Sequence, residues 1–312
     1  MTMNFKRYTL KTMPAALFMF FAVGLILSIC PASNAVAEKQ ETAVDDKEIQ
    51  SADYLSRGKS YLKSGRPDDA ISEFNNAIGL APENARAYFS RGNAYYVKGQ
   101  IDEAIADYDK AIALNPRYTN AYFSRGYYFQ MVGELGRAIA DYDMVISLHP
   151  EHAFAYNYRG NAYFSLEQYQ KAFDDYSSAI ALDPGYANAY INRGNYYQMK
   201  KEYEKAVADF SMAITIQPGN AYAYSFRGVA FFENEQRQKA FDDYSRVIAL
   251  EPGNVDAYLR RGYIYHVTRE EYPLAVSDYS KAIELNPDDA MAYHLRGSAY
   301  LAQIRNDEAL SD

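Results

Sequence analysis

The stretch AYFSRGNAYY at residues 87–96 decides the fold, because nearly the same ten residues return as AYNYRGNAYF at 155–164. The Arg-Gly pair inside it occurs eight times along the 312-residue chain. Six of the intervals between these glycines are 34 residues long, and the last is 35. The glycines are Gly58, Gly92, Gly126, Gly160, Gly194, Gly228, Gly262 and Gly297. A sequence that repeats at a fixed period of this length predicts a stacked array of similar units.

Each unit carries two apolar stripes with helical spacing. Tyr, Gly and an aromatic residue at offsets −4, 0 and +3 lie on one side of a first helix. An Ala and an aromatic residue, 12 and 16 residues after most of the glycines, form the stripe of a second helix, and a proline ends it. These second-helix rings are Phe74, Tyr108, Tyr142, Tyr176, Phe210, Tyr244 and Tyr279. The small Gly and Ala let the helices of a pair approach closely, and neighbouring pairs must stack to cover the remaining apolar faces.

With the glycine as position 8, every unit has Tyr at position 4 and an aromatic residue at position 11. Complete units also have Ala at position 20, an aromatic residue at position 24 and Pro at position 32, apart from a one-residue insertion in the seventh. This pattern resembles the tetratricopeptide repeat (TPR) family over residues 51–312. The resemblance implies an all-α solenoid of antiparallel helix pairs wound as a right-handed superhelix, whose first helices line a concave groove for peptides or partner proteins. The expected repeats are 51–84, 85–118, 119–152, 153–186, 187–220, 221–254, 255–289 and a truncated eighth at 290–312.

Residues 1–37 have the layout of an export signal. A basic start that includes Lys6 is followed by an apolar run at 14–30 and by Ala-Val-Ala at 35–37. The run is short for a membrane span, which needs about 20 residues. We therefore predict a cleaved signal peptide, no membrane insertion afterwards, and a periplasmic or secreted protein.

Two other interpretations of this segment stay open. The signal could remain uncleaved as an anchor, or Cys30 could carry a lipid, although Ile29 stands where the lipoprotein pattern has a small residue. Residues 38–50 are polar and acidic, and we expect them to form a linker or a weak leading helix.

An arginine precedes each glycine, and in each complete unit an acidic residue precedes the second-helix ring, as Arg159 and Asp175 do. Because Gly and Ala touch across the helix pair, these charges should lie together. A basic strip for acidic ligands is one interpretation of the arginines. Internal Arg–carboxylate pairs are the interpretation that we prefer, since every arginine has its own acid and pairing lowers the cost of partial burial.

Positions 2, 5, 9 and 12 of the first helix face the groove in the TPR family. Of the twenty residues at these positions in repeats two to six, eight are aromatic, eight are Asn or Gln, and one is charged. Amides can bond a peptide backbone and rings offer rigid apolar area, although rings at these positions can also simply pack between repeats. The candidate peptide-binding residues are Phe89, Asn93, Tyr96, Phe123, Tyr127, Gln130, Asn157, Asn161, Phe164, Asn195, Gln198, Tyr222 and Phe232.

Several function classes are disfavoured by composition. The chain has 32 basic against 40 acidic residues, which argues against nucleic-acid binding. Its single Cys rules out a thiolate zinc site, and His149 and His152 have no third ligand nearby. No nucleophile–base set or phosphate loop is visible, so we expect no enzyme, no metal and no cofactor. The clamp that binds chaperone tails needs a basic residue at position 5, and none of the eight repeats has one.

The sequence thus predicts an exported TPR scaffold or adaptor that binds proteins or extended peptides and takes part in envelope assembly in bacteria. Two rival interpretations are a non-catalytic subunit that presents substrate to a separate envelope enzyme, and a self-assembling structural protein. In the truncated repeat we expect at most a short second helix from Arg305, a frayed end, and a weak homodimer through that end.

Overall fold

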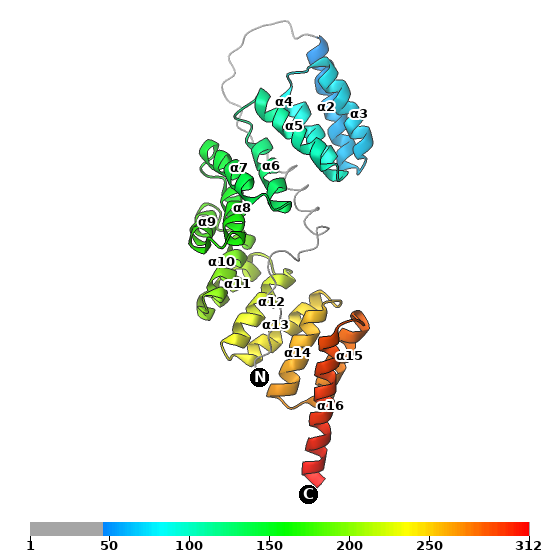
Figure 1. Ribbon diagram of the computed structural model, residues 1–312, viewed down its shortest axis with the longest axis vertical. Coiled ribbons are helices and arrows are strands. Elements are labelled where there is room, and N and C mark those ends of the chain that lie inside the picture. The colour runs from blue at the N-terminus through cyan, green and yellow to red at the C-terminus, as the bar shows by residue number, and fades with distance from the viewer. Residues whose placement is uncertain (1–45, 312) are drawn as a thin grey trace. The chain divides into compact units, whose positions relative to one another are not determined.

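The computed structural model describes the backbone of residues 46–311 (Figure 1). The predictions of a signal peptide, a lipid on Cys30 and most of the linker lie outside the described residues, as does Asp312. Every regular element between 46 and 311 is an α-helix, which confirms the predicted all-α class. The helices are α2 (Asp46–Lys63), α3 (Pro67–Leu80), α4 (Ala85–Val97), α5 (Ile101–Leu114), α6 (Thr119–Met131), α7 (Leu135–Leu148), α8 (Ala153–Ser165), α9 (Tyr169–Leu182), α10 (Ala187–Met199), α11 (Tyr203–Ile216), α12 (Ala221–Glu233), α13 (Arg237–Leu250), α14 (Val255–Thr268), α15 (Tyr272–Leu285) and α16 (Ala290–Ser311).

The helices stack as repeated pairs. From α4 onward, an even-numbered first helix packs against the odd-numbered second helix that follows it, and that helix packs against the next first helix. First helices of neighbouring repeats also contact each other, as α6 does with α8 and α10 with α12. This is the solenoid arrangement that the 34-residue period predicts.

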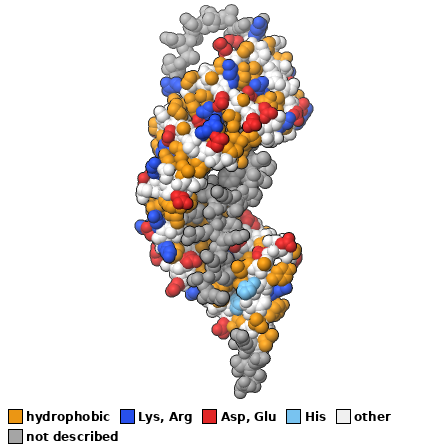
Figure 2. Space-filling model, in the orientation of Figure 1, with side chains coloured by type: hydrophobic (Ala, Val, Ile, Leu, Met, Phe, Trp, Pro, Cys, Tyr) orange, Lys and Arg blue, Asp and Glu red, His pale blue; other side chains and the backbone are white. Residues whose placement is uncertain are grey.

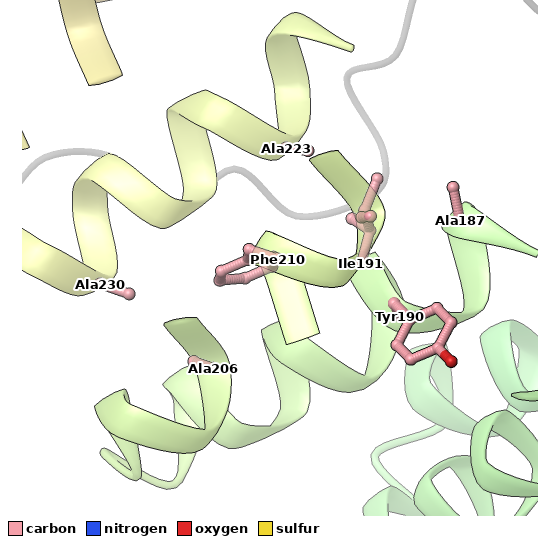
Figure 3. Packing of buried hydrophobic residues seen from close by; sticks show 8 residues of the cluster. Ala187, Tyr190, Ile191, Ala206, Phe210, Ala223 and Ala230 are labelled. Carbon is pink, nitrogen blue, oxygen red and sulfur yellow. The ribbon is translucent and has the colours of Figure 1, made fainter. Parts of the chain in front are cut away.

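The second-helix ring and the first-helix glycine form the centre of each pair. A Cβ atom added at Gly194 would lie 2.6 Å from a ring carbon of Phe210, and at Gly160 it would lie 2.7 Å from Tyr176. Any side chain there would clash, so the spacing requires glycine. Figure 3 shows this core in the fifth repeat, where Phe210 points toward Ala230 of the next first helix.

The turns inside the pairs need one residue in the left-handed region. Gly65, Gly99 and Gly133 supply it in the first three repeats, with φ between +73° and +85°. Non-glycine residues stand there in the next four repeats, with φ between +54° and +61°: Glu167, Lys201, Glu235 and Glu270. A residue with a Cβ is strained in this region by about 1 kcal/mol, so packing elsewhere must hold these turns.

Polar side chains begin several of the first helices. Asn84, Asn220 and Asn254 accept hydrogen bonds from backbone N–H groups of the first turns of α4, α12 and α14. His152 does the same for α8, since its Nδ1 accepts from the N–H of Ala155 at 3.2 Å. This explains His152 without a metal.

The two ends of the described array need separate description. Helix α2 begins at Asp46, so the last residues of the range 38–50 are helical, which is one of the two alternatives expected from the sequence. The last element, α16, is one continuous helix that runs to Ser311, so the expected break before a second helix at Arg305 does not occur. The turn position of this repeat is Ile304, a β-branched residue that resists the left-handed conformation.

Candidate functional site

The thirteen candidate residues all lie on the first helices α4, α6, α8, α10 and α12. We call positions 2, 5, 9 and 12 of these helices the first-helix face. The spacing of these positions places them along one side of each helix. Because neighbouring first helices contact each other, the strips of adjacent repeats lie side by side.

Most candidate rings pack against aromatic residues of the adjacent repeat. Tyr127 and Phe123 lie 5.5 and 5.4 Å between ring centroids from Tyr158 of the next repeat, whereas Phe89 lies 5.1 Å from Tyr118 at the end of its own repeat. Burial raises the pKa of Tyr118 and of Tyr158 to about 12, so both phenols stay neutral at ordinary pH. These rings therefore join repeats as well as forming a surface.

Sequence reasoning missed the rings just outside the chosen positions. Tyr158 lies at position 6 of its repeat and contacts three rings of the preceding repeat. Tyr186 directly precedes α10 and lies 4.6 Å from Phe154. The available signal was that these positions are aromatic in some repeats only, since Phe226 shares the position of Tyr158 and Tyr118 shares that of Tyr186.

Three candidate amides are occupied by tyrosine hydroxyls from the paired second helix. Tyr108 donates to Asn93 Oδ1 at 2.8 Å, Tyr142 to Gln130 Oε1 and Tyr176 to Asn161 Oδ1, both at 2.9 Å. Buried tyrosine hydroxyls need such partners. These carbonyl oxygens are thus already engaged inside the protein.

Asn157 is also engaged, and it is nearly fully buried. Its Nδ2 donates to the hydroxyl of Tyr186 at 3.1 Å, and its Oδ1 accepts from Asn192 Nδ2 at 2.8 Å. This amide links α8 to α10 across the repeat boundary.

Asn195 and Gln198 on α10 differ from the other amides. The side chain of neither residue forms a hydrogen bond with any residue between 46 and 311. The Oε1 atom of Gln198 is buried and lacks a partner among the described residues. Phe164 on α8 and Phe232 on α12 hold the same repeat position as Gln198 and are half-buried.

The predicted arginine pairs are confirmed in all seven complete repeats. In repeats two to seven the carboxylate accepts from both Nε and Nη2, as Asp175 does from Arg159 at 2.9 and 2.7 Å. Arg57 pairs with Glu73 at 2.9 Å. The eighth expected pair, of Arg296 with Asp312, lies outside the described residues. The arginines of the seven complete repeats are thus paired with carboxylates of the protein, and they do not form a basic strip for acidic ligands.

Sequence reasoning missed a further bond that each of these arginines makes. From Arg91 onward, Nη1 donates to the residue that directly follows the ring of the preceding repeat. The acceptors are Asn75, Asp109, Asp143, Ser177, Ser211, Ser245 and Ser280. The signal was present, because a short polar residue follows every ring in the sequence. Each arginine thus ties its own pair together and binds the pair before it.

Surface charge is mixed. Figure 2 shows acidic, basic and hydrophobic side chains interspersed over α2 to α5, without a continuous field of one sign on the visible side. Within the described range, no cluster of three or more His, Cys, Asp or Glu residues could hold a metal ion. None of the helices in the described range is long and apolar enough to span a bilayer.

Comparison with family models identifies the repeat. A model described as "Tetratricopeptide repeat" matches residues 55–119, and another with this description matches 153–186 and 187–220. A third, described as "TPR repeat", matches 266–303, so the matches together span more than half of the chain. The chain belongs to the tetratricopeptide repeat family. The TPR fold is a scaffold for protein–protein interaction, and its members are typically non-catalytic.

Solved TPR structures are similar to this TPR protein. One from Parabacteroides merdae is 20% identical with a TM-score of 0.59, and the match covers 81% of this chain and 99% of that one. YrrB, described as "a TPR protein with an unusual peptide-binding site", is 25% identical with a TM-score of 0.51 over 61% of this chain and 97% of its own. PilF of Pseudomonas aeruginosa is 16% identical with a TM-score of 0.62 over 71% and 99%. A comparison with curated protein sequences found no match.

Proposed function

We propose that this TPR protein is an exported scaffold or adaptor, and that its first-helix face binds proteins or extended peptides, most fittingly during assembly of the cell envelope. The observation that carries the binding proposal is the composition of that face. It combines rings with amides and holds one charge among twenty positions in repeats two to six. Such a face suits an extended backbone better than a charged ligand.

Similarity to YrrB supports a peptide as the ligand, because YrrB is described as having an unusual peptide-binding site. The confirmed arginine pairs support it as well. The arginines that precede the repeat glycines are bonded to acidic residues of the protein. They therefore do not offer a row of free positive charges to an acidic ligand.

Affinity capture tests the binding site. The chain from Glu38 onward is immobilised, incubated with an envelope extract of the source cells, and the retained proteins are identified by mass spectrometry. A variant with Phe164→Lys and Phe232→Lys should lose the retained protein. A matched control with Met144→Lys and Met212→Lys changes exposed residues of second helices and should retain it. Retention by both variants would contradict binding at the first-helix face.

Export rests on the sequence of residues 1–37 alone and has its own test. The full-length chain is expressed in a bacterium, the cells are fractionated, and the N-terminus of the mature protein is sequenced. We expect an N-terminus near Glu38 outside the cytoplasm. An intact Met1 in the cytoplasmic fraction would contradict export.

A further inference from the structure

At positions 9 and 12 of the first-helix face, the second-helix ring decides whether an amide is occupied. Where the ring is tyrosine and an amide stands opposite, the hydroxyl donates to that amide, as in repeats two, three and four. Repeats six and seven have tyrosine but carry Val229 and Tyr263 at position 9 instead of an amide. The carbonyl oxygen of an occupied amide already accepts a hydrogen bond from the tyrosine hydroxyl, so it is not available to a ligand.

The fifth repeat combines two amides with a ring that has no hydroxyl. Its ring is Phe210, while Asn195 holds the position of Asn161 and Gln198 holds the position of Gln130. Phe210 is fully buried against Gly194, so its ring packs as the tyrosines do. The hydrogen bond that Tyr176 gives to Asn161 is therefore missing here because of one absent oxygen atom, and not because of a different backbone.

An amide without a partner is costly where water is excluded. Leaving a buried polar atom unpaired costs about 1–3 kcal/mol. The Oε1 atom of Gln198 is buried and has no hydrogen-bond partner among the described residues. The side chain of Asn195 also forms no hydrogen bond with any described residue. A ligand that donates to these oxygens and accepts from the adjacent NH₂ groups would recover this energy once the side chains turn toward it.

The surroundings select the chemistry of that ligand. Phe164 and Phe232 hold the position of Gln198 on the neighbouring first helices α8 and α12, which both contact α10, so apolar rings stand on either side of the amides along the stack. Asn195 and Gln198 are three residues apart, which is about 4.5 Å along the helix axis. An extended peptide alternates N–H and C=O groups at about 3.3 Å per residue, so two amides at this spacing can bond neighbouring peptide units.

We propose that helix α10 is the place where this array holds the main chain of an extended, uncharged peptide segment, through Asn195 and Gln198. In repeats two to four, the tyrosine hydroxyls occupy amides at the same positions, and these amides are therefore unavailable to the main chain of a peptide. The proposal rests on the peptide-binding function proposed above and narrows it to one repeat.

A peptide selected on the protein itself supplies the probe. A random library of 12-residue peptides displayed on phage is selected against the chain from Glu38 onward. The most enriched sequence is synthesised, and its affinity is measured by calorimetry. Phe210→Tyr adds the missing hydroxyl, which should donate to Asn195 and weaken the peptide about fivefold, the effect of one lost hydrogen bond. Asn195→Ala with Gln198→Ala should weaken it about tenfold or more.

Asn161→Ala is the matched control. It removes the same side chain from the neighbouring repeat, where Tyr176 already occupies the amide. We expect the peptide affinity to stay within twofold of the original while the midpoint of thermal unfolding falls, because the hydroxyl of Tyr176 loses its acceptor. Asn195→Ala should show the opposite, with lower affinity and an unchanged midpoint.

The outcomes separate the two proposals. If a peptide binds but Phe210→Tyr and the double alanine variant both stay within twofold, the α10 site is refuted and peptide binding stands. If the library enriches no sequence above a selection without protein, the peptide-binding function and the α10 site fall together. Binding of chito-oligosaccharides, used as a second probe, in place of any peptide would also overturn the proposal.

Discussion

Replacing Arg159 by leucine should destabilise the centre of the array strongly. Arg159 is only 18% exposed and makes three hydrogen bonds to two carboxylates. Its guanidinium also lies 5.4 Å from the ring centre of Tyr156 and 5.9 Å from that of Tyr163. Leucine keeps the apolar stem and removes every one of these interactions.

The magnitude follows from what the leucine leaves behind. Asp175 is 8% exposed in its side chain, so without Arg159 it becomes a largely desolvated, unpaired carboxylate. Removing one partner of such a pair costs about 3–5 kcal/mol. Asp175→Asn keeps an oxygen acceptor for Nε or Nη2, and the expected loss is about 1–2 kcal/mol. Asp143 is about half exposed, so Asp143→Asn should cost at most about 1 kcal/mol.

The assay must report on one repeat, since a long repeat array does not unfold in a single two-state step. Native-state hydrogen exchange of the amides in α8 and α9 gives this local free energy of opening. We expect the order Arg159→Leu, then Asp175→Asn, then Asp143→Asn, from the largest loss to the smallest. Losses below about 0.5 kcal/mol for the first two variants would show that water replaces these bonds without cost, and the reasoning would be refuted.

Three other predictions use matched positions of the repeat. Glu167→Gly should raise the stability of its repeat by about 1 kcal/mol in urea unfolding, because it relieves a positive φ; an equal or lower stability would contradict strain at this turn. Burial lowers the pKa of His152 below its ordinary value near 6.5, so the unfolded chain binds the proton more readily and stability should fall as the pH drops below about 6.5. His152→Asn keeps a cap without this proton, and a similar loss in both proteins would exclude His152 as its source. Gly194→Ala should lower the midpoint of thermal unfolding, since the added Cβ would lie 2.6 Å from a ring carbon of Phe210. Gly297→Ala is the control and should not lower it, since nothing described outside its own helix turn lies within 4 Å of the added Cβ. Equal effects of the two substitutions in calorimetry would contradict this.

The repeat could be predicted from sequence because its decisive contacts recur. A glycine faced by a ring at a fixed distance in the chain, and an arginine with its own acid, return in register in each complete unit. Helix bounds failed where a residue departs from the period. The turn position of the last repeat holds the β-branched Ile304, and α16 continues through it to Ser311.

The candidate site was harder to predict because repeat position does not reveal occupancy. Asn161 and Asn195 share a position and have similar sequence surroundings. Yet only the side chain of Asn161 forms a hydrogen bond within residues 46–311, since its opposing ring is Tyr176. The residue that makes the difference is the ring 15 positions later in the paired second helix, which is tyrosine for Asn161 and phenylalanine for Asn195. Tyr158 packs on rings of the preceding repeat, and no periodic signal marks it.

The bond that each arginine makes to the preceding repeat changes chemistry along the chain. Asn75 accepts it in the first repeat, Asp109 and Asp143 accept it in the second and third, and serines accept it from Ser177 to Ser280, at 3.1–3.5 Å. In a linear array, stability is a sum of terms for single repeats and for the junctions between them. The junctions therefore differ in kind: two ionic, salt-sensitive junctions lie between one neutral junction on the N-terminal side and four neutral junctions on the C-terminal side. Raising the ionic strength should weaken the two ionic junctions and leave the others unchanged, so the concentration of salt sets how firmly the second and third repeats are held to the repeats that follow them.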